Sequence, residues 1–253
     1  MIKNRFIQWQ KNHFLTVFFL LVSFSALGIA TNCLAKGGIS ISQTRVIFDA
    51  NMKSTKVTLN NRSDQVYLVN SRVQRTPDNT VKSTETLPFI VTPPLFRLEK
   101  ESRNTVLISK NDTSALPTDR ESVFYLSFLA IPSVKKGIEA NSSATTTQVS
   151  FGIRTLIKLF YRPEGLAISP LAAPGKFSFS SDGIMLHVKN PTPYYQTLAQ
   201  LSVNGRLVNV REQGAMVAPF SSQAYAVKGL ADDIQWSVID DHGGLSETFR
   251  WTR

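Results

Sequence analysis

The sequence has little cysteine, little charge and few long apolar runs. Its 253 residues include one cysteine, and 18% are charged while 42% are hydrophobic. A single cysteine excludes a small fold held together by disulfide bonds, and the apolar fraction is too high for a chain that is disordered throughout. The length fits one large domain or two of common size. We therefore expect a globular protein with a substantial core.

The one long apolar run lies at the start of the chain and has the features of an export signal. Positive residues precede the run, which extends from Phe14 to Ala30, and small residues at positions 33 and 35 suit a cleavage site. Residues 1–35 are therefore predicted to be a signal peptide. Its removal would take away the only cysteine and lower the net charge of +10 by three. An uncleaved membrane anchor is the alternative, since about 17 to 25 apolar residues can cross a bilayer.

The remainder of the chain follows a two-residue hydrophobic period, which is typical of β-strands. Two sets of short predicted strands are separated by Arg162-Pro163-Glu164-Gly165 and predict two β-sandwiches in series. The domains are accordingly placed at 36–162 and 167–253, with a linker at 163–166. Asn204-Gly205 predicts a hairpin turn, and no long stretch has a helical period. The predicted strands are Ile39–Phe48, Thr55–Leu59, Val66–Val73, Phe89–Thr92, Leu95–Leu98, Thr105–Ser109, Val123–Ile131, Val149–Tyr161, Phe177–Phe179, Ile184–Val188, Thr197–Val203, Arg206–Val210, Gln223–Val227, Ile234–Ile239 and Glu247–Trp251.

Nothing in the sequence indicates catalysis, a metal or a cofactor. After cleavage two histidines remain, His187 on a strand and His242 in a turn, and neither lies in a metal-binding spacing. Motifs of serine hydrolases, zinc proteases and phosphate-binding loops are absent. The positive residues are scattered and are not interleaved with aromatics, which argues against nucleic-acid binding. We expect a protein that is not an enzyme and has no metal site.

The segment Thr145–Tyr161 is unusual because it is long for a strand and contains no acid and no proline. Its alternation places Val149, Phe151 and Ile153 on one face together with Ile157 and Leu159. Two interpretations stay open. The segment is either an ordinary core strand or an exposed apolar edge, and an exposed edge invites pairing with another chain.

Two cations occupy positions where alternation predicts apolar residues. Arg45 shares a face with Ile39, Ile41 and Ile47, and Lys158 shares a face with Leu156 and Phe160. Burying an unpaired charge is costly. Either these side chains extend to water, or they bind a carboxylate that a ligand supplies.

At these residues the chain resembles the periplasmic pilus (fimbrial) assembly chaperones. The resemblance covers residues 38–253 and keeps the order of the family's motifs. The matching segments are Thr44-Arg45-Val46-Ile47-Phe48, Thr92-Pro93-Pro94-Leu95-Phe96-Arg97-Leu98, Leu116-Pro117-Thr118-Asp119-Arg120-Glu121-Ser122-Val123-Phe124-Tyr125-Leu126, Ile157-Lys158-Leu159-Phe160-Tyr161-Arg162-Pro163, Asn190-Pro191-Thr192-Pro193-Tyr194-Tyr195, Met216-Val217-Ala218-Pro219-Phe220-Ser221 and Asp240-Asp241-His242-Gly243-Gly244.

The resemblance implies an all-β protein of two immunoglobulin-like sandwiches in an L-shaped or boomerang arrangement. It implies a periplasmic chaperone that stabilises pilus subunits by donor-strand complementation and delivers them to an outer-membrane usher. Arg45 and Lys158 would bind the C-terminal carboxylate of the subunit, and Val149, Phe151 and Ile153 would fill its open groove. Glu121, Arg162 and Asp241 would form a charged cluster between the domains, with Asp240 as the neighbouring alternative and ordinary surface ion pairs as the competing interpretation.

Two questions remain open at the level of the sequence. The polar segment Ser133–Gln148 is predicted to be a loop and is long for the short-loop branch of the family, yet the mature chain lacks the paired cysteines of the long-loop branch. Few residues separate Ala35 from Arg45, which favours the short-loop branch. An exported all-β subunit of a surface fibre is the alternative function, and it would self-associate through an added strand.

Overall fold

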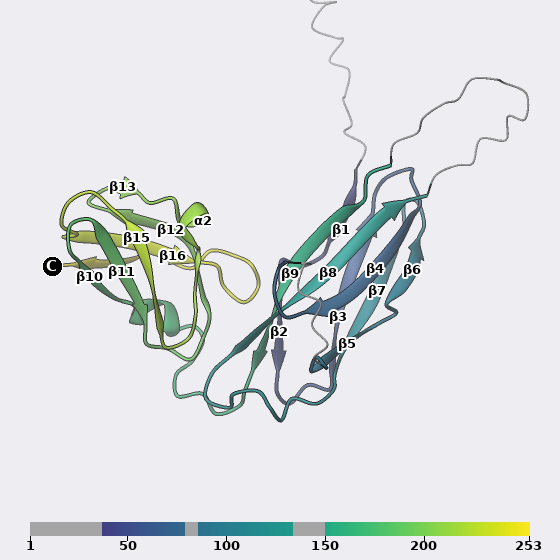
Figure 1. The fold of residues 1–253 in the computed structure, drawn as a ribbon, viewed down its shortest axis with the longest axis horizontal. Coiled ribbons are helices and arrows are strands. Elements are labelled where there is room, and N and C mark those ends of the chain that lie inside the picture. The colour runs from purple at the N-terminus through teal and green to yellow at the C-terminus, as the bar shows by residue number, and fades with distance from the viewer. Residues whose placement is uncertain (1–36, 79–85, 134–149) are drawn as a thin grey trace, which may run out of the picture. The chain divides into compact units, whose positions relative to one another are not determined.

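The computed structural model describes residues 37–78, 86–133 and 150–253, and nearly all of its regular structure is β-strand. The strands gather in two groups, the first coloured purple to teal-green and the second green to yellow (Figure 1). Each group has its own cluster of buried apolar residues. The predicted all-β class with two sandwiches is confirmed. The predicted signal peptide, Val149 and residues 134–148 lie outside the described residues.

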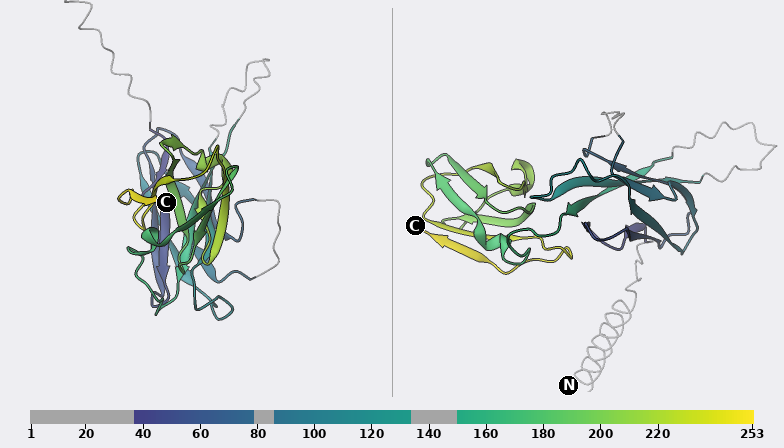
Figure 2. Two further views of the ribbon diagram at one scale, coloured as in Figure 1. Left: turned by 90° about the vertical axis from the view of Figure 1, so that its left-hand side faces the viewer. Right: turned by 90° about the horizontal axis from the view of Figure 1, so that it is seen from below.

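The first sandwich consists of two sheets, and the views of Figure 2 show its strands from two further directions. One sheet has the order β1-β3-β7-β5 and the other the order β2-β9-β8-β4-β6. Their bounds are β1 (Ile39–Ile41), β3 (Ser54–Asn61), β7 (Arg103–Lys110), β5 (Phe89–Thr92), β2 (Arg45–Asp49), β9 (Ile153–Arg162), β8 (Ser122–Pro132), β4 (Tyr67–Gln74) and β6 (Leu95–Leu98).

The second sandwich also has two sheets. One has the order β10-β11-β15 and the other the order β13-β12-β16-β17, with β14 paired to β12. The helical elements of this part of the chain are short, the 3₁₀ turn η1 and the helix α2. The bounds are η1 (Ala173–Lys176), β10 (Ser178–Ser181), β11 (Met185–Asn190), β15 (Ser221–Ala226), β13 (Arg206–Leu207), β12 (Gln196–Val203), β16 (Asp233–Val238), β17 (Phe249–Thr252), β14 (Met216–Val217) and α2 (Val210–Gln213).

The first predicted strand, Ile39–Phe48, is two strands. β1 pairs antiparallel with β3, whereas β2 pairs parallel with β9 in the opposite sheet. The chain crosses from one sheet to the other at residues 42–44, where the Ser42 backbone N–H donates to the carbonyl of Thr58. Arg45 therefore does not share a sheet face with Ile39 and Ile41, and this part of the sequence interpretation is wrong.

The Asn204-Gly205 turn is confirmed, but the strand after it is shorter than predicted. Ser202 pairs with Leu207 and Val203 with Arg206. Asn204 and Gly205 have φ values of 50° and 76°, the left-handed pair that a two-residue hairpin loop requires. The predicted strand Arg206–Val210 ends at Leu207, because the chain then turns into α2 and buries Val210 in the second core.

The two sandwiches use the same device to close a turn. Asn61 and Asn190 are both buried at the end of a strand. Asn61 Oδ1 accepts hydrogen bonds from the N–H and hydroxyl of Ser63, and Asn190 Oδ1 accepts the same pair from Thr192. Each amide NH₂ donates to backbone carbonyls, at Gln65 in the first sandwich and at Tyr194 in the second, among others. The buried side-chain amides of Asn61 and Asn190 are thus hydrogen-bonded at both the oxygen and the nitrogen.

Candidate functional site

β9 carries most of the candidate site because it lies between β8 and β2 and continues beyond β2. Tyr161 to Ile153 pair with Ser122 to Ala130 of β8, whereas β2 pairs only from Lys158 onward. In the part of the chain that the structure describes, no strand pairs with the other edge of β9 at residues 153–157. Unpaired N–H and C=O groups on such an edge can accept a further strand.

The side chains on one face of β9 pass from a covered to an open environment. Leu159 is fully buried and Ile157 is 7% exposed, whereas Ile153 is 55% exposed and Phe151, just before the strand, is 77% exposed. All four have odd residue numbers and therefore lie on the same side of the strand. The core-facing row of β9 thus continues past the end of the core of the first sandwich. Val149, the third predicted member of the row, lies outside the described residues.

Arg45 and Lys158 are directly opposed in the parallel ladder of β2 and β9. Their neighbours Val46 and Leu159 point into the core and are buried, so the two cations lie on the outer face of the sheet. Residues opposite each other in a ladder hold their side chains close together. The structure thus brings the two predicted anchor residues, which are more than a hundred residues apart in sequence, to one place.

Arg45 is held in position, but one of its hydrogen-bond donors has no acceptor among the described residues. Its Nη1 donates to the carbonyl oxygen of Ile239 at 3.0 Å, and its guanidinium carbon lies 5.8 Å from the ring centroid of Phe160. Its Nε is buried, and no residue of the described ranges accepts a hydrogen bond from it. Burial lowers the pKa of Arg45, while Asp241 and Asp240 raise it. A buried donor without an acceptor is a place where an anion can bind.

Lys158 has no acidic partner among the described residues, where no hydrogen bond or ion pair to its Nζ is found. Burial lowers its pKa, and the positive charge of Arg45 lowers it further. Both effects disfavour the ammonium form of Lys158. A carboxylate placed between the two cations would offset the repulsion between Lys158 and Arg45 and favour the charged form.

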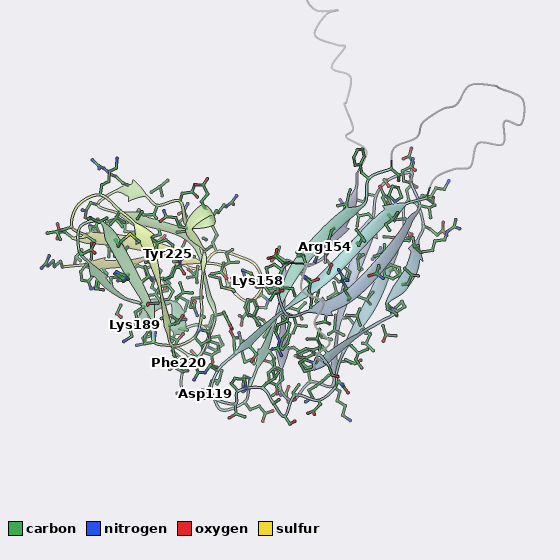
Figure 3. The ribbon with its side chains drawn as sticks, viewed as in Figure 1. Asp119, Arg154, Lys158, Lys189, Phe220 and Tyr225 are labelled. Atoms are coloured by element: carbon green, nitrogen blue, oxygen red, sulfur yellow. The ribbon has the colours of Figure 1, made fainter. Side chains whose placement is uncertain are left out.

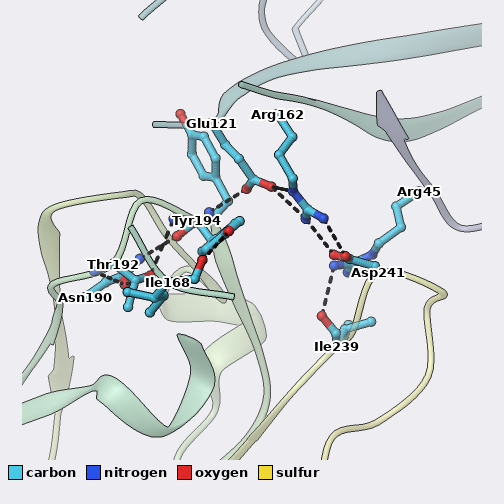
Figure 4. A network of polar contacts seen from close by, with 10 residues as sticks. Arg45, Glu121, Arg162, Ile168, Asn190, Thr192, Tyr194, Ile239 and Asp241 are labelled. Atoms are coloured by element: carbon cyan, nitrogen blue, oxygen red, sulfur yellow. Dashed lines mark hydrogen bonds and ion pairs between the residues drawn. The ribbon is translucent and has the colours of Figure 1, made fainter. Parts of the chain in front are cut away.

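The predicted charged cluster centres on Arg162 (Figure 4). Its Nε donates to Glu121 Oε1 at 2.8 Å, and its Nη1 and Nη2 donate to the two oxygens of Asp241 at 2.7 and 2.9 Å. The other oxygen of Glu121 accepts the backbone N–H of Tyr195 at 2.8 Å. Asp240 instead accepts the N–H groups of His242 and Gly244 within its own turn. Arg162 therefore pairs with Asp241, the aspartate that the resemblance suggested, and not with the neighbouring alternative Asp240.

The environment of the cluster raises the pKa of both Glu121 and Arg162, for different reasons. Burial raises the pKa of Glu121 to about 7, although Arg162 and the Tyr195 N–H both lower it. For Arg162 burial alone would lower the pKa, but hydrogen bonds to Asp241 and the charge of Glu121 raise it overall. Glu121 is almost completely buried, so its charge depends on the guanidinium beside it.

Residues to which the sequence interpretation gave no role also join the first and second sandwiches. Gly243 has a φ of 86°, and a Cβ at this position would collide with the Thr44 hydroxyl. The guanidinium of Arg120, which also pairs with Asp119, lies 4.9 Å from the ring centroid of Phe220. Asp119 and Phe220 are labelled in Figure 3. Of these, only the Gly243-Gly244 pair offered a signal in the sequence, as a turn with special backbone angles.

A cavity of about 550 Å³ adjoins these groups. Arg45, Phe160, Arg162, Asp241 and Phe249 are among the residues that line it. The cavity combines positive, negative and apolar walls, so it can accept a chain segment that has both polar and apolar parts.

Comparison with known proteins assigns both sandwiches. Residues 38–167 match the model of the pili and flagellar-assembly chaperone PapD N-terminal domain, and residues 172–250 match that of the pili assembly chaperone PapD C-terminal domain. The chain belongs to the pilus assembly chaperone family. It is 34% identical over 241 residues to the probable fimbrial chaperone YadV of Escherichia coli K12, covering 91% of this chain and 93% of the relative.

Solved structures of family members agree with the fold. A chain from the structure of the Salmonella enterica SafA pilin in complex with the SafB chaperone has a TM-score of 0.72 and 29% identity, covering 85% of this chain and 96% of its own. The periplasmic chaperone SfaE has a TM-score of 0.68 and 31% identity, covering 84% and 98%. Family membership decides against the alternative of a fibre subunit. In the described ranges no helix is long and apolar enough to cross a membrane.

Proposed function

We propose that this chain holds a pilus subunit along the free edge of β9, with the subunit's C-terminal carboxylate between Arg45 and Lys158. Family membership supports the function class, and the SafA–SafB complex supports a pilin as the kind of partner. The observation that carries the proposal is that β9 has an exposed apolar row at Phe151 and Ile153 and, further along the strand, Lys158 opposite Arg45, two cations with no carboxylate partner among the described residues.

The arrangement of β2 and β9 supports one direction for the bound strand. β2 occupies the edge of β9 from Lys158 onward. A chain that ends at Lys158 and also covers Ile153 must therefore approach from the Phe151 side and run parallel to β9. It would continue the line of β2 within the same sheet and pair with the free backbone groups of residues 153–157.

The two parts of the site make different contributions. Hydrogen bonds from the cations to one carboxylate are worth about 1.5 to 3 kcal/mol each and fix the register. Burial of apolar side chains contributes about 1.5 to 3 kcal/mol for each, so Phe151 and Ile153, with Val149 as the predicted third member, supply much of the affinity. The carboxylate sets the position of the subunit and the apolar row holds it.

The charged cluster would keep the anchor next to the second sandwich. Arg162 follows the anchor on β9 and binds Asp241, while Arg45 binds the carbonyl of Ile239 two residues earlier. We therefore assign Glu121, Arg162 and Asp241 the role of joining domains 36–162 and 167–253 through the linker 163–166.

The remaining parts of the function rest on the family. Residues 1–35 would be removed on export, leaving a periplasmic protein that acts by binding alone, without catalysis, and that passes its subunit to an outer-membrane usher. The absence of paired cysteines in residues 36–253 favours the short-loop branch.

The proposal is tested by recovering the chaperone–subunit complex after co-expression with a pilus subunit encoded beside the chain. Wild type should elute from a size-exclusion column as a one-to-one complex, and Ile153→Asp should give little complex while its melting temperature stays within a few degrees of wild type. Leu207→Asp is the matched control, because Leu207 is 78% exposed and lies on β13 of the second sandwich, in a different sheet from β9. A normal yield of complex from Ile153→Asp would refute the proposal.

A further inference from the structure

The part of β9 that would hold the subunit is the part with the least support from its own sheet. From Lys158 to Arg162 the strand has β8 on one side and β2 on the other. From Ile153 to Ile157 it has β8 on one side only, within the described residues. A strand with one neighbour frays more readily than one with two, yet the apolar row must stay at a fixed distance from the anchor.

Arg154 lies at the beginning of this weakly supported segment and reaches across the sheet. Its Nε donates to Ser127 Oγ at 3.0 Å, and its Nη2 donates to Gln74 Oε1 at 2.8 Å and to the carbonyl of Pro77 at 3.4 Å. Ser127 belongs to β8 and Gln74 ends β4. One side chain thus ties three adjacent strands together on the face opposite Ile153.

The ladder registers show what these hydrogen bonds connect. Gln74 pairs with Tyr125 of β8, and Tyr125 pairs with Lys158 of β9. Gln74 therefore lies in the same row across the sheet as the anchor lysine. By binding Gln74, Arg154 links the level of the apolar row to the level of the anchor, four residues along the strand. Figure 3 marks the positions of Arg154 and Lys158.

The hydrogen-bond acceptors of Arg154 also distinguish it from the arginines that form ion pairs. Arg97, Arg120, Arg162 and Arg250 each pair with a carboxylate. Arg154 donates to a hydroxyl, an amide and a backbone carbonyl, all neutral. A planar guanidinium with several donors in fixed directions suits such a bridge, whereas a lysine could satisfy only part of it.

We propose that Arg154 is a positioning residue, which clamps the donor segment of β9 to β8 and β4 so that Phe151 and Ile153 keep a fixed register relative to Arg45 and Lys158. This inference rests on the proposed function for its purpose, but the clamp itself can be tested on the free chain. The bound strand would then meet an edge that is already ordered, and binding would not have to bear the entropy cost of ordering it.

The first measurement is amide hydrogen exchange in the free mature chain. In Arg154→Met the amides of residues 153–157 that are hydrogen-bonded to β8 should exchange about tenfold faster or more, while amides of the second sandwich stay unchanged. Arg97→Met is the matched control, because Arg97 lies on β6 at the far edge of the same sheet. Gln74→Met removes the main acceptor and should produce a smaller increase at the same amides. Unchanged exchange in both Arg154→Met and Gln74→Met would overturn the clamp.

The second measurement is the affinity for a synthetic peptide that copies the C-terminal strand of the subunit. A long peptide that reaches Phe151 should bind Arg154→Met about tenfold more weakly, and Arg154→Lys should recover part of the loss. A peptide shortened at its N-terminus, which keeps the C-terminal carboxylate and contacts β9 only from Ile157 onward, should bind Arg154→Met as tightly as wild type. A general loss of stability would weaken the binding of both peptides. Equal losses for both peptides would contradict the positioning role. If Lys158→Met binds the long peptide as wild type does, the anchor fails, and the exchange data still decide the clamp.

Discussion

Lys158 lies directly opposite Arg45 in the parallel ladder of β2 and β9, so two positive side chains share one face of the sheet, and no carboxylate of the described residues forms an ion pair with either. Like charges in directly opposed positions destabilise a sheet. The two cations differ in their own contacts, because Arg45 donates to the carbonyl of Ile239 whereas Lys158 makes no such contact in the described residues. The free chain thus holds an arrangement that a bound carboxylate would stabilise.

Replacing Lys158 by methionine should leave the free chain as stable as wild type or stabilise it by about 0.2–1 kcal/mol, because the opposed charge is removed while the side-chain stem is kept. Arg45→Met should instead destabilise the chain by about 1.5–3 kcal/mol, since it removes the charged donor to Ile239. Urea unfolding of the two variants checks both. A destabilised Lys158→Met would mean that Lys158 has a structural role.

Removing Arg162 should be far more costly than removing an exposed arginine with the same kind of partner. In Arg162→Met the buried Glu121 loses its counter-charge, which is expected to cost about 3–5 kcal/mol at pH 8. Arg250→Met is the matched control, because Arg250 also pairs with an aspartate but is largely exposed, and it should change stability little. Adding Glu121→Gln to Arg162→Met should recover much of the loss, and no recovery would show that the cost lies elsewhere.

The raised pKa of Glu121 predicts a specific pH dependence. The folded chain holds a proton on Glu121 up to a pKa of about 7, whereas the unfolded chain releases it near the ordinary value of 4.5. Protons therefore favour folding in this range, and the contribution of Glu121 to stability is lost as the pH rises from about 4.5 to about 7. The free energy of unfolding of wild type minus that of Glu121→Gln should fall by about 3 kcal/mol across this range. A flat difference would show that Glu121 titrates normally.

Gly243 should tolerate alanine less well than another glycine with a similar backbone angle. Both Gly243 and Gly205 have positive φ, so alanine at either costs about 1–2 kcal/mol in backbone strain. At Gly205 a Cβ would meet open space, whereas at Gly243 it would collide with Thr44. Thermal unfolding should show a larger loss for Gly243→Ala, and Thr44→Ala in the same chain should reduce it. Equal losses at the two glycines would contradict the close approach of Thr44.

The two-residue period was enough to predict the all-β fold, because alternation reports directly which side chains enter a core. It did not predict the crossing at residues 42–44, since alternate apolar residues continue on both sides of it and only three polar residues mark the change of sheet. It also extended the strand after Gly205 too far, because Val210 is buried by α2 and not by a strand. Tertiary packing decided both cases.

The candidate site was predictable where a residue breaks the pattern. Arg45 and Lys158 stand out because cations occupy apolar positions, and the structure places them side by side. The partners that hold the site were not predictable. Ile239 and Tyr195 act through backbone groups, which leave no trace in the choice of residue. Arg154 binds Gln74, eighty positions away, and only the strand order brings the two together.

The central claim is that the cation pair recognises the free C-terminal carboxylate of a pilus subunit. Calorimetric titration of the mature chain with the C-terminal peptide of its subunit, once with a free carboxylate and once amidated, tests it most directly. The free acid should bind wild type at least about tenfold more tightly than the amide, a difference of about 1.4 kcal/mol, and Lys158→Met should abolish that difference. Equal affinity of wild type for the two peptides would contradict the account.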